Sequence, residues 1–285
     1  MTDDVVIDVL SGRARTAPVG VTWLPDDALD ALFWGKASSP AEALGALAEN
    51  VPLDFAFVPA DAAWAEDGVT AVRGAGATPM WAIAGPLGRV EARLGALETL
   101  RMSAAEPAGL AAIIDRELHA ALDEVRRAGE LGVRALVVAD DLAGDEGPLV
   151  SPDYVLEALV PCYRRLAQQA RELEIIPLFH SDGDVRALVP ALARAGYAGL
   201  HSGSVTASRL ATVAEAAWAN GLVMIGGLHA GNLLSATRDE AASAVSLSRQ
   251  GAMLVSDDGG IASAEQLAAF VTAARAVRSS LAQSS

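Results

Sequence analysis

The sequence predicts a single-domain (β/α)8 barrel of the TIM type that spans all 285 residues. From Val19 onward, short apolar runs rich in β-branched residues alternate with longer segments that have helical periodicity. We count eight such runs, and eight strand–helix repeats typically close a parallel sheet into a barrel. A doubly wound open sheet is the alternative, but no Gly-x-Gly-x-x-Gly motif follows an early strand.

The predicted strands are short and bounded by polar, proline or glycine residues. In chain order they are Val19–Leu24, Phe55–Val58, Met80–Ala84, Ala135–Ala139, Ile176–Phe179, Gly199–Leu200, Leu222–Ile225 and Ala252–Val255. Segments between them, such as 110–131 and 264–281, repeat apolar residues at helical spacing. We therefore expect a helix in these connections.

Local signals set several boundaries. Ser151-Pro152-Asp153 supplies a helix N-cap followed by proline, and Gly132 and Gly196 stand where helices should stop. The glycine-rich segment 69–78 suggests an inserted hairpin. We expect the N-terminal ~17 and the C-terminal ~6 residues to be disordered.

Composition narrows the class of protein. The net charge of −15 argues against nucleic acid and anionic membranes as partners, since both favour basic surfaces. No apolar run approaches the ~20 residues that span a bilayer, and the acidic N-terminus lacks the basic flank of a signal peptide. We expect a cytoplasmic protein with a small-molecule substrate.

Cys162 is the only cysteine, so intrachain disulfides and thiolate-rich zinc sites are excluded. It lies within the helical pattern 154–173, where we expect a buried structural thiol.

Polar residues follow most of the predicted strands, and in a barrel these strand ends converge on one mouth. The residues at these positions are Asp61, Gly85, Asp140, Asp141, His180, Asp182, His201, His229, Asp257 and Asp258. Of the four histidines only His119 lies elsewhere. Because histidine suits acid–base and ligand chemistry near neutral pH, we predict a functional site at the mouth.

Two of these groups have competing interpretations. His180 and Asp182, with Asp258 or Asp257, could hold a divalent metal such as zinc through nitrogen and oxygen ligands. The sequence 182–184 also fits a turn that caps the next helix. Asp61 could equally be the N-cap of the helix that follows it.

The order of the motifs resembles the uroporphyrinogen decarboxylase superfamily, which contains heme-pathway decarboxylases and corrinoid-linked methyltransferases. The resemblance runs from about Asp54 to the C-terminus. Its motifs are Leu53–Asp61, Gly85-Pro86, Asp140-Asp141-Leu142 with Ser151-Pro152, Ile176–Gly183, Gly226-Gly227-Leu228 and Ser256–Ile261. His229 stands where the family usually has Asp.

The resemblance implies roles for the strand-end residues. Asp61 corresponds to the carboxylate that stabilises positive charge on the protonated substrate ring. With the strand-end placement, this gives the following assignment: catalytic Asp61, Asp141 and His229; substrate-binding Gly85, Arg89, Asp140, His201 and Asp257; metal-binding His180, Asp182 and Asp258.

The sequence also departs from the family. The decarboxylases carry an Arg-rich loop after the first strand, but segment 23–32 has Asp26, Asp27 and Asp30 and no Arg. Their histidine in the last motif falls at Gly259, and no tyrosine is found within 85–94. The zinc-dependent methyltransferases have thiolates where this chain has Asp182 and Gly259.

Three functions remain open. The leading one is a one-carbon methyltransferase that works with a corrinoid protein or a pterin acceptor such as tetrahydrofolate. The second is a divergent porphyrinogen or other tetrapyrrole decarboxylase, which would need no cofactor. The third is a catalytically silent binding protein.

Overall fold

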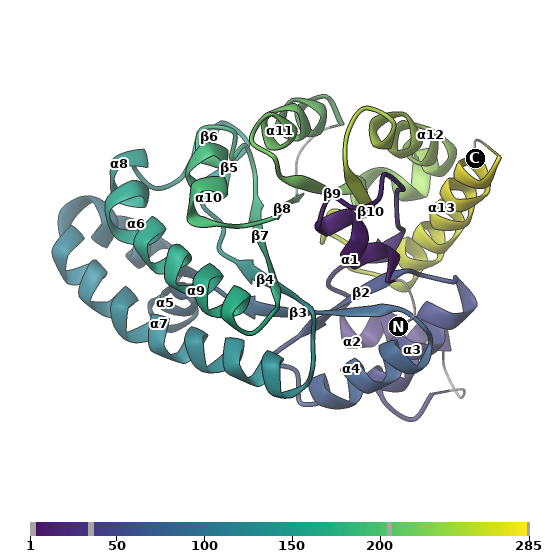
Figure 1. Cartoon of the computed structure of the whole chain (residues 1–285), viewed down its shortest axis with the longest axis horizontal. Coiled ribbons are helices and arrows are strands. Elements are labelled where there is room, and N and C mark those ends of the chain that lie inside the picture. The colour runs from purple at the N-terminus through teal and green to yellow at the C-terminus, as the bar shows by residue number, and fades with distance from the viewer. Residues whose placement is uncertain (1–3, 34–36, 204–206, 284–285) are drawn as a thin grey trace.

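The computed structural model describes residues 4–33, 37–203 and 207–283. Its main sheet has eight parallel strands in the order β1-β2-β3-β4-β7-β8-β9-β10, wound into a barrel (Figure 1). A parallel bridge between Val19 and Val255 joins the first and last strands. These contacts confirm the (β/α)8 barrel in a single domain and exclude the open sheet, in which those strands would be separate edges.

Each of the eight predicted runs overlaps a strand of the barrel. The strands are β1 (Gly20–Val21), β2 (Phe55–Pro59), β3 (Thr78–Ala84), β4 (Ala135–Ala139), β7 (Ile176–Asp182), β8 (Gly199–Gly203), β9 (Val223–Leu228) and β10 (Met253–Asp257). A small antiparallel hairpin, β5 (Ala143–Gly144) with β6 (Gly147–Pro148), lies between β4 and β7 in the sequence.

Helices surround the barrel. They are α2 (Asp26–Phe33), α3 (Pro40–Asn50), α4 (Ala65–Gly74), α5 (Pro86–Leu94), α6 (Ala96–Ala105), α7 (Pro107–Glu130), α8 (Pro152–Tyr154), the π-helical turn η1 (Val155–Leu159), α9 (Val160–Glu172), α10 (Val189–Ala195), α11 (Ala207–Ala219), α12 (Ala230–Ser248) and α13 (Ala264–Ala282). The predicted cap and stops are confirmed, since Ser151 caps α8 and Gly132 and Gly196 adopt positive φ after α7 and α10. Within the described residues, no helix combines the length and apolar character needed to cross a membrane.

Side chains alternate between the inside and the outside of the barrel wall. Phe55 and Phe57 of β2 belong to an inner apolar cluster, whereas Ala56 and Val58 pack in the outer core beneath the helices. The inner cluster uses mainly residues among the first three of each strand, such as Leu178 of β7. The interior of the barrel is therefore apolar near the amino ends of the strands. The polar side chains that point inward lie near the carboxyl ends.

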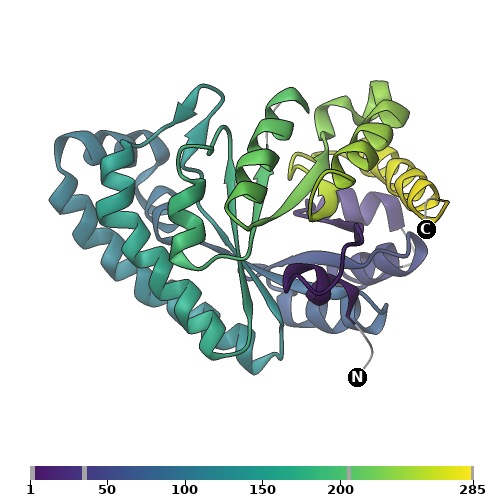
Figure 2. The ribbon, with the colours of Figure 1, turned by 45° about the horizontal axis from the view of Figure 1, so that its top comes forward.

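From Asp4 onward the described N-terminal residues include a packed helix, where we expected disorder. Helix α1 (Val5–Leu10) buries Val6, Ile7, Val9 and Leu10 against the inner cluster, and Asp4 caps its first turn. This helix appears in dark purple in Figure 2. It closes the amino end of the barrel. A helix of six residues is too short to show a reliable period in the sequence.

Two further predictions were wrong. Most of segment 69–78 belongs to α4, whose face of Ala65, Gly68, Val69 and Val72 is buried, so no hairpin forms there. Gly76, with φ of +83°, ends the helix before β3. At the C-terminus, α13 continues to Ala282 in the tail that we expected to be disordered.

Candidate active site at the barrel mouth

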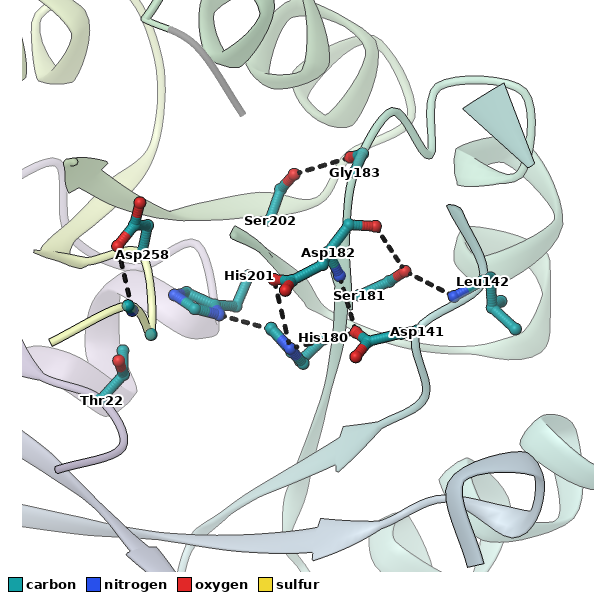
Figure 3. A network of polar contacts seen from close by, with 12 residues as sticks. Thr22, Asp141, Leu142, His180, Ser181, Asp182, Gly183, His201, Ser202 and Asp258 are labelled. Atoms are coloured by element: carbon teal, nitrogen blue, oxygen red, sulfur yellow. Dashed lines mark hydrogen bonds and ion pairs between the residues drawn. The ribbon is translucent and has the colours of Figure 1, made fainter. Parts of the chain in front are cut away.

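Two histidines face each other across neighbouring strands at the mouth. His180 of β7 pairs in register with His201 of β8, so both side chains lie on the same, inner face of the sheet. Their Nδ1 atoms are 2.7 Å apart, and the rings stack with centroids separated by 4.9 Å (Figure 3). Trp23 packs on His180 at 4.5 Å and Phe57 on His201 at 5.6 Å. The aromatic rings shield this contact from water.

The hydrogen bonds determine which ring nitrogens carry protons. The Nε2 atom of His201 lies 3.1 Å from the carbonyl oxygen of Asp257, and a carbonyl can only accept, so this nitrogen carries the proton. Burial, reinforced by the neighbouring His180, lowers the pKa of His201 to about 3. The neutral ring therefore has a bare Nδ1, and the Nδ1–H of His180 donates to it.

The other nitrogen of His180 is directed at two carboxylates. Its Nε2 lies 3.5 Å from Oδ1 of Asp141 and 3.7 Å from Oδ1 of Asp182. Contact with His180 lowers the pKa of Asp141. Because Nδ1 donates to His201, the lone pair of Nε2 points between the two carboxylates, where a bound cation could accept it.

Main-chain amides hold the Asp141 carboxylate and join the segment that carries it to β7. The amide of Asp182 donates to Oδ1 of Asp141 at 2.9 Å, and the amide of Leu142 donates to Oγ of Ser181 at 2.9 Å. These bonds tie the segment that follows β4 to the end of β7 (Figure 3). Asp141 and Asp182 therefore share one edge of the mouth.

Asp141, His180 and Asp182 fit a divalent metal. One ligand atom from each lies within 4.8 Å of the others. Ligand atoms bound to zinc at 2.0–2.1 Å in a tetrahedron are about 3.4 Å apart, close to the distances from Nε2 to both carboxylates. Both carboxylates are partly exposed, and three protein ligands would leave a position open for a substrate.

Asp258, the third metal ligand that we predicted, belongs to a neighbouring cluster. Its Oδ2 lies 3.3 Å from Nδ1 of His229, and its Oδ1 accepts from the amides of Ala230 and Gly260. Glu240 accepts from the amide of His229 at 2.9 Å. These bonds fix His229 at the start of α12.

Gly203 separates the two clusters. A Cβ atom on Gly203 would clash with Oδ1 of Asp182 and with the carbonyl oxygen of Asp258. The candidate metal group of Asp141, His180 and Asp182 and the His229–Asp258 pair therefore approach each other at a position where a side chain larger than that of glycine would clash.

A cavity lies next to the His229–Asp258 pair. It measures about 210 Å³ and is lined by His229, Asp258 and Ser202 among others. The sequence predicts Asp61, Asp141, His180 and His229 at one mouth, and of these four only His229 lines this cavity.

Three residues predicted to bind substrate form a structural contact outside the barrel wall. The carboxylate of Asp140 accepts from the amides of Leu87 at 3.1 Å and Gly88 at 2.6 Å and from the hydroxyl of Tyr163 at 2.8 Å. Burial raises the pKa of Asp140 to about 7. A Cβ atom on Gly85 would clash with this carboxylate, and Arg89 donates to the carbonyl of Ala84. Asp140 thus holds the start of α5 against β4.

Asp257 joins the first and last strands. Its buried carboxylate accepts from the amide of Thr22 at 2.8 Å, from the Thr22 hydroxyl at 2.5 Å and from the amide of Gly259 at 2.9 Å. Burial raises the pKa of Asp257 to about 6. Its main-chain carbonyl, not its side chain, contacts His201.

Asp61 is exposed just after β2, and the N-cap position of α4 is held by Trp64, whose side chain makes no capping hydrogen bond. The capping interpretation of Asp61 is therefore wrong, and its catalytic role stays a prediction. Trp23 is the site residue that the sequence analysis missed. It lies within the predicted first strand, where an aromatic residue is indistinguishable from core.

The fold and the site together define a (β/α)8 barrel protein with an acidic, histidine-containing mouth. Residues 76–255, more than half of the chain, match the family described as uroporphyrinogen decarboxylase (URO-D). The chain belongs to this family. A search of curated protein sequences finds no match.

Solved structures of other proteins share the fold. A methyltransferase from Methanosarcina mazei has a TM-score of 0.71 at 15% identity, over 94% of this chain and 96% of that chain. D-psicose 3-epimerase from Clostridium cellulolyticum H10 has a TM-score of 0.53 at 9% identity, over 94% and 98%. D-allulose 3-epimerase from Methylomonas sp. has a TM-score of 0.54 at 14% identity, over 95% and 98%. At these identities the similarity concerns the fold alone.

Proposed function

We propose that this protein is a metal-dependent methyltransferase that moves a one-carbon group between a small-molecule substrate and a corrinoid protein or a pterin such as tetrahydrofolate. The observation that carries the proposal is the position of His180 Nε2 between the carboxylates of Asp141 and Asp182. A divalent cation such as Zn²⁺ suits this set of nitrogen and oxygen donors.

Two features favour methyl transfer over decarboxylation. After β1 the chain carries Asp26, Asp27 and Asp30 in place of the Arg-rich loop of the decarboxylases, so a substrate with many carboxylates would be repelled. The similarity to the Methanosarcina mazei methyltransferase, over nearly the full length of both chains, supports the same choice.

The side chains suit the chemistry of such a transfer. The methyl group leaves its donor without the electron pair of the broken bond and forms a new bond to an acceptor that gives up a proton. A metal at the mouth would act as a Lewis acid on that acceptor. The Nδ1 atom of His229 accepts from the amide of Gly231 at 3.1 Å and lies 3.3 Å from the carboxylate of Asp258, so it is the unprotonated ring nitrogen. We assign this Nδ1 to take the acceptor's proton, beside the carboxylate that would balance the charge.

Demethylation of methylcobalamin tests the proposal directly. Protein loaded with Zn²⁺ is mixed with methylcobalamin and a set of small thiol and amine acceptors, and the cobalamin absorbance is followed. We expect demethylation that requires Zn²⁺ and is lost in His180→Ala. It should persist in His119→Ala, a matched control because His119 is exposed on α7.

The same preparation is also tested with methyltetrahydrofolate and with uroporphyrinogen. Decarboxylation of uroporphyrinogen without demethylation of either methyl donor would contradict the proposal and favour the decarboxylase. The absence of all three activities in folded, metal-loaded protein would favour a binding protein.

A further inference from the structure

We infer that His201 is a positioning residue that fixes the proton of His180 on Nδ1 and thereby makes Nε2 the metal-binding atom. This inference rests on the metal site proposed above. His201 itself lies outside the three-residue metal group and is fully buried.

The first step of the argument is the direction of the hydrogen-bond chain. The carbonyl of Asp257 accepts from Nε2–H of His201 at 3.1 Å. The ring is fully buried and no hydrogen bond to a carboxylate of the described residues pairs it, so it carries no second proton and its Nδ1 is an acceptor. This Nδ1 lies 2.7 Å from Nδ1 of His180, too close for two protons or two lone pairs to face each other. His180 must therefore be the donor.

The second step concerns what His180 would do without this partner. Its Nε2 faces Asp141 and Asp182 at 3.5 and 3.7 Å, so a neutral ring free to choose would place its proton on Nε2, toward the carboxylates. A cation would then have to displace that proton. Because Nδ1 of His201 accepts the proton of His180, that proton stays on Nδ1 of His180 and the lone pair of Nε2 faces the metal position.

The third step is the geometry that holds His201 in place. Its ring packs against Trp23 at 5.7 Å and Phe57 at 5.6 Å, and the carbonyl of Asp257 holds its Nε2 at 3.1 Å. Outer partners of this kind that fix the tautomer of a ligating histidine typically contribute 10- to 100-fold to metal affinity. We expect an effect of that size here.

Two substitutions at His201 separate positioning from packing. His201→Gln offers one acceptor and one donor, so its amide can accept from His180 and donate to Asp257. His201→Leu fills the space but offers neither. Phe57→Leu is the matched control. The Phe57 side chain is buried and packs on His201, but it takes no part in the hydrogen bonds that join Asp257, His201 and His180.

The readouts are Zn²⁺ affinity, by competition with a chromogenic chelator, and the tautomer of His180, by ¹⁵N NMR of metal-free protein at alkaline pH. We expect His201→Leu to bind Zn²⁺ 10- to 100-fold more weakly and to move the His180 proton to Nε2. His201→Gln and Phe57→Leu should keep both the wild-type affinity and the Nδ1–H tautomer.

Three outcomes overturn the inference: an Nε2–H tautomer of His180 in the wild type, an unchanged tautomer in folded His201→Leu, or an equal loss of affinity in Phe57→Leu. Failure of wild-type protein to bind Zn²⁺ would instead remove the metal from the proposed function. The NMR comparison uses metal-free protein, so it still decides whether His201 sets the proton of His180.

Discussion

The closure of the barrel should depend on the ionisation of Asp257. Its carboxylate is fully buried and accepts three hydrogen bonds, two of them from Thr22 in the segment that follows β1. Asp257→Ala would leave the amide and hydroxyl of Thr22 without an acceptor in a buried place. At 1–3 kcal/mol for each buried polar group left unsatisfied, we expect a loss of about 3 kcal/mol of unfolding free energy.

The pH dependence follows from the sign of the shift. Burial raises the pKa of Asp257 from 3.8 to about 6, so the folded protein retains a proton that the unfolded chain has released. Stability should therefore fall as pH rises from about 4 to about 6 and change no further through this group above that range. At 1.36 kcal/mol per pKa unit, the whole contribution of Asp257 is about 3 kcal/mol between pH values well below 3.8 and well above 6, and about 2 kcal/mol of it is lost between pH 4 and pH 6.

Urea unfolding followed by circular dichroism at pH 4, 5, 6 and 7 measures this effect. Asp257→Asn cannot ionise, so the difference in unfolding free energy between wild type and variant should shift by about 2 kcal/mol in favour of the variant from pH 4 to pH 7. Asp145→Asn, an exposed position in the β5–β6 hairpin, is the control and should leave the pH profile unchanged. A constant difference between wild type and Asp257→Asn at every pH would refute the reasoning.

Three further predictions concern packing and space. Ile7→Ala should lower the unfolding free energy by about 2–5 kcal/mol because Ile7 fills the amino end of the barrel, whereas exposed Val5→Ala should change it by less than about 0.5 kcal/mol in urea titrations. Tyr163→Phe removes a donor to a buried carboxylate and should cost about 2 kcal/mol. Tyr154→Phe is its control and should leave stability unchanged, because the Tyr154 hydroxyl has no hydrogen-bond partner among the described residues. Calorimetry measures both variants, and a larger loss of stability in Tyr154→Phe than in Tyr163→Phe would contradict this prediction. Gly203→Ala should lower the unfolding free energy and weaken Zn²⁺ binding in equilibrium dialysis, because its Cβ would clash with Oδ1 of Asp182 and with the carbonyl of Asp258. Unchanged stability and affinity would show that the mouth has more room than these contacts indicate.

Local properties of the chain were enough to predict the barrel. The eight apolar runs, the helical spacing between them and caps such as Ser151 act over a few residues, so the sequence displays them directly. The short α1 was missed because its stability comes from burial in the barrel and not from its own period.

The candidate site was predictable as a set of strand-end residues but not as a geometry. Asp140 and Asp141 are adjacent in the sequence, yet the alternation along the strand sends one carboxylate to the start of α5 and the other to His180. Asp257 and Asp258 separate in the same way, the first toward Thr22 and the second toward His229.

The sequence by itself determined the class of fold, the end of the barrel that carries the polar groups and the exclusion of thiolate ligands, because each of these follows from residue type and order. Only the tertiary structure decided which side chains meet. His180 and His201 touch because β7 and β8 pair in a particular register, and the proton between them depends on a carbonyl of β10. Contacts between distant segments depend on register and on the direction of each side chain, and neither can be read from residue order along a single chain.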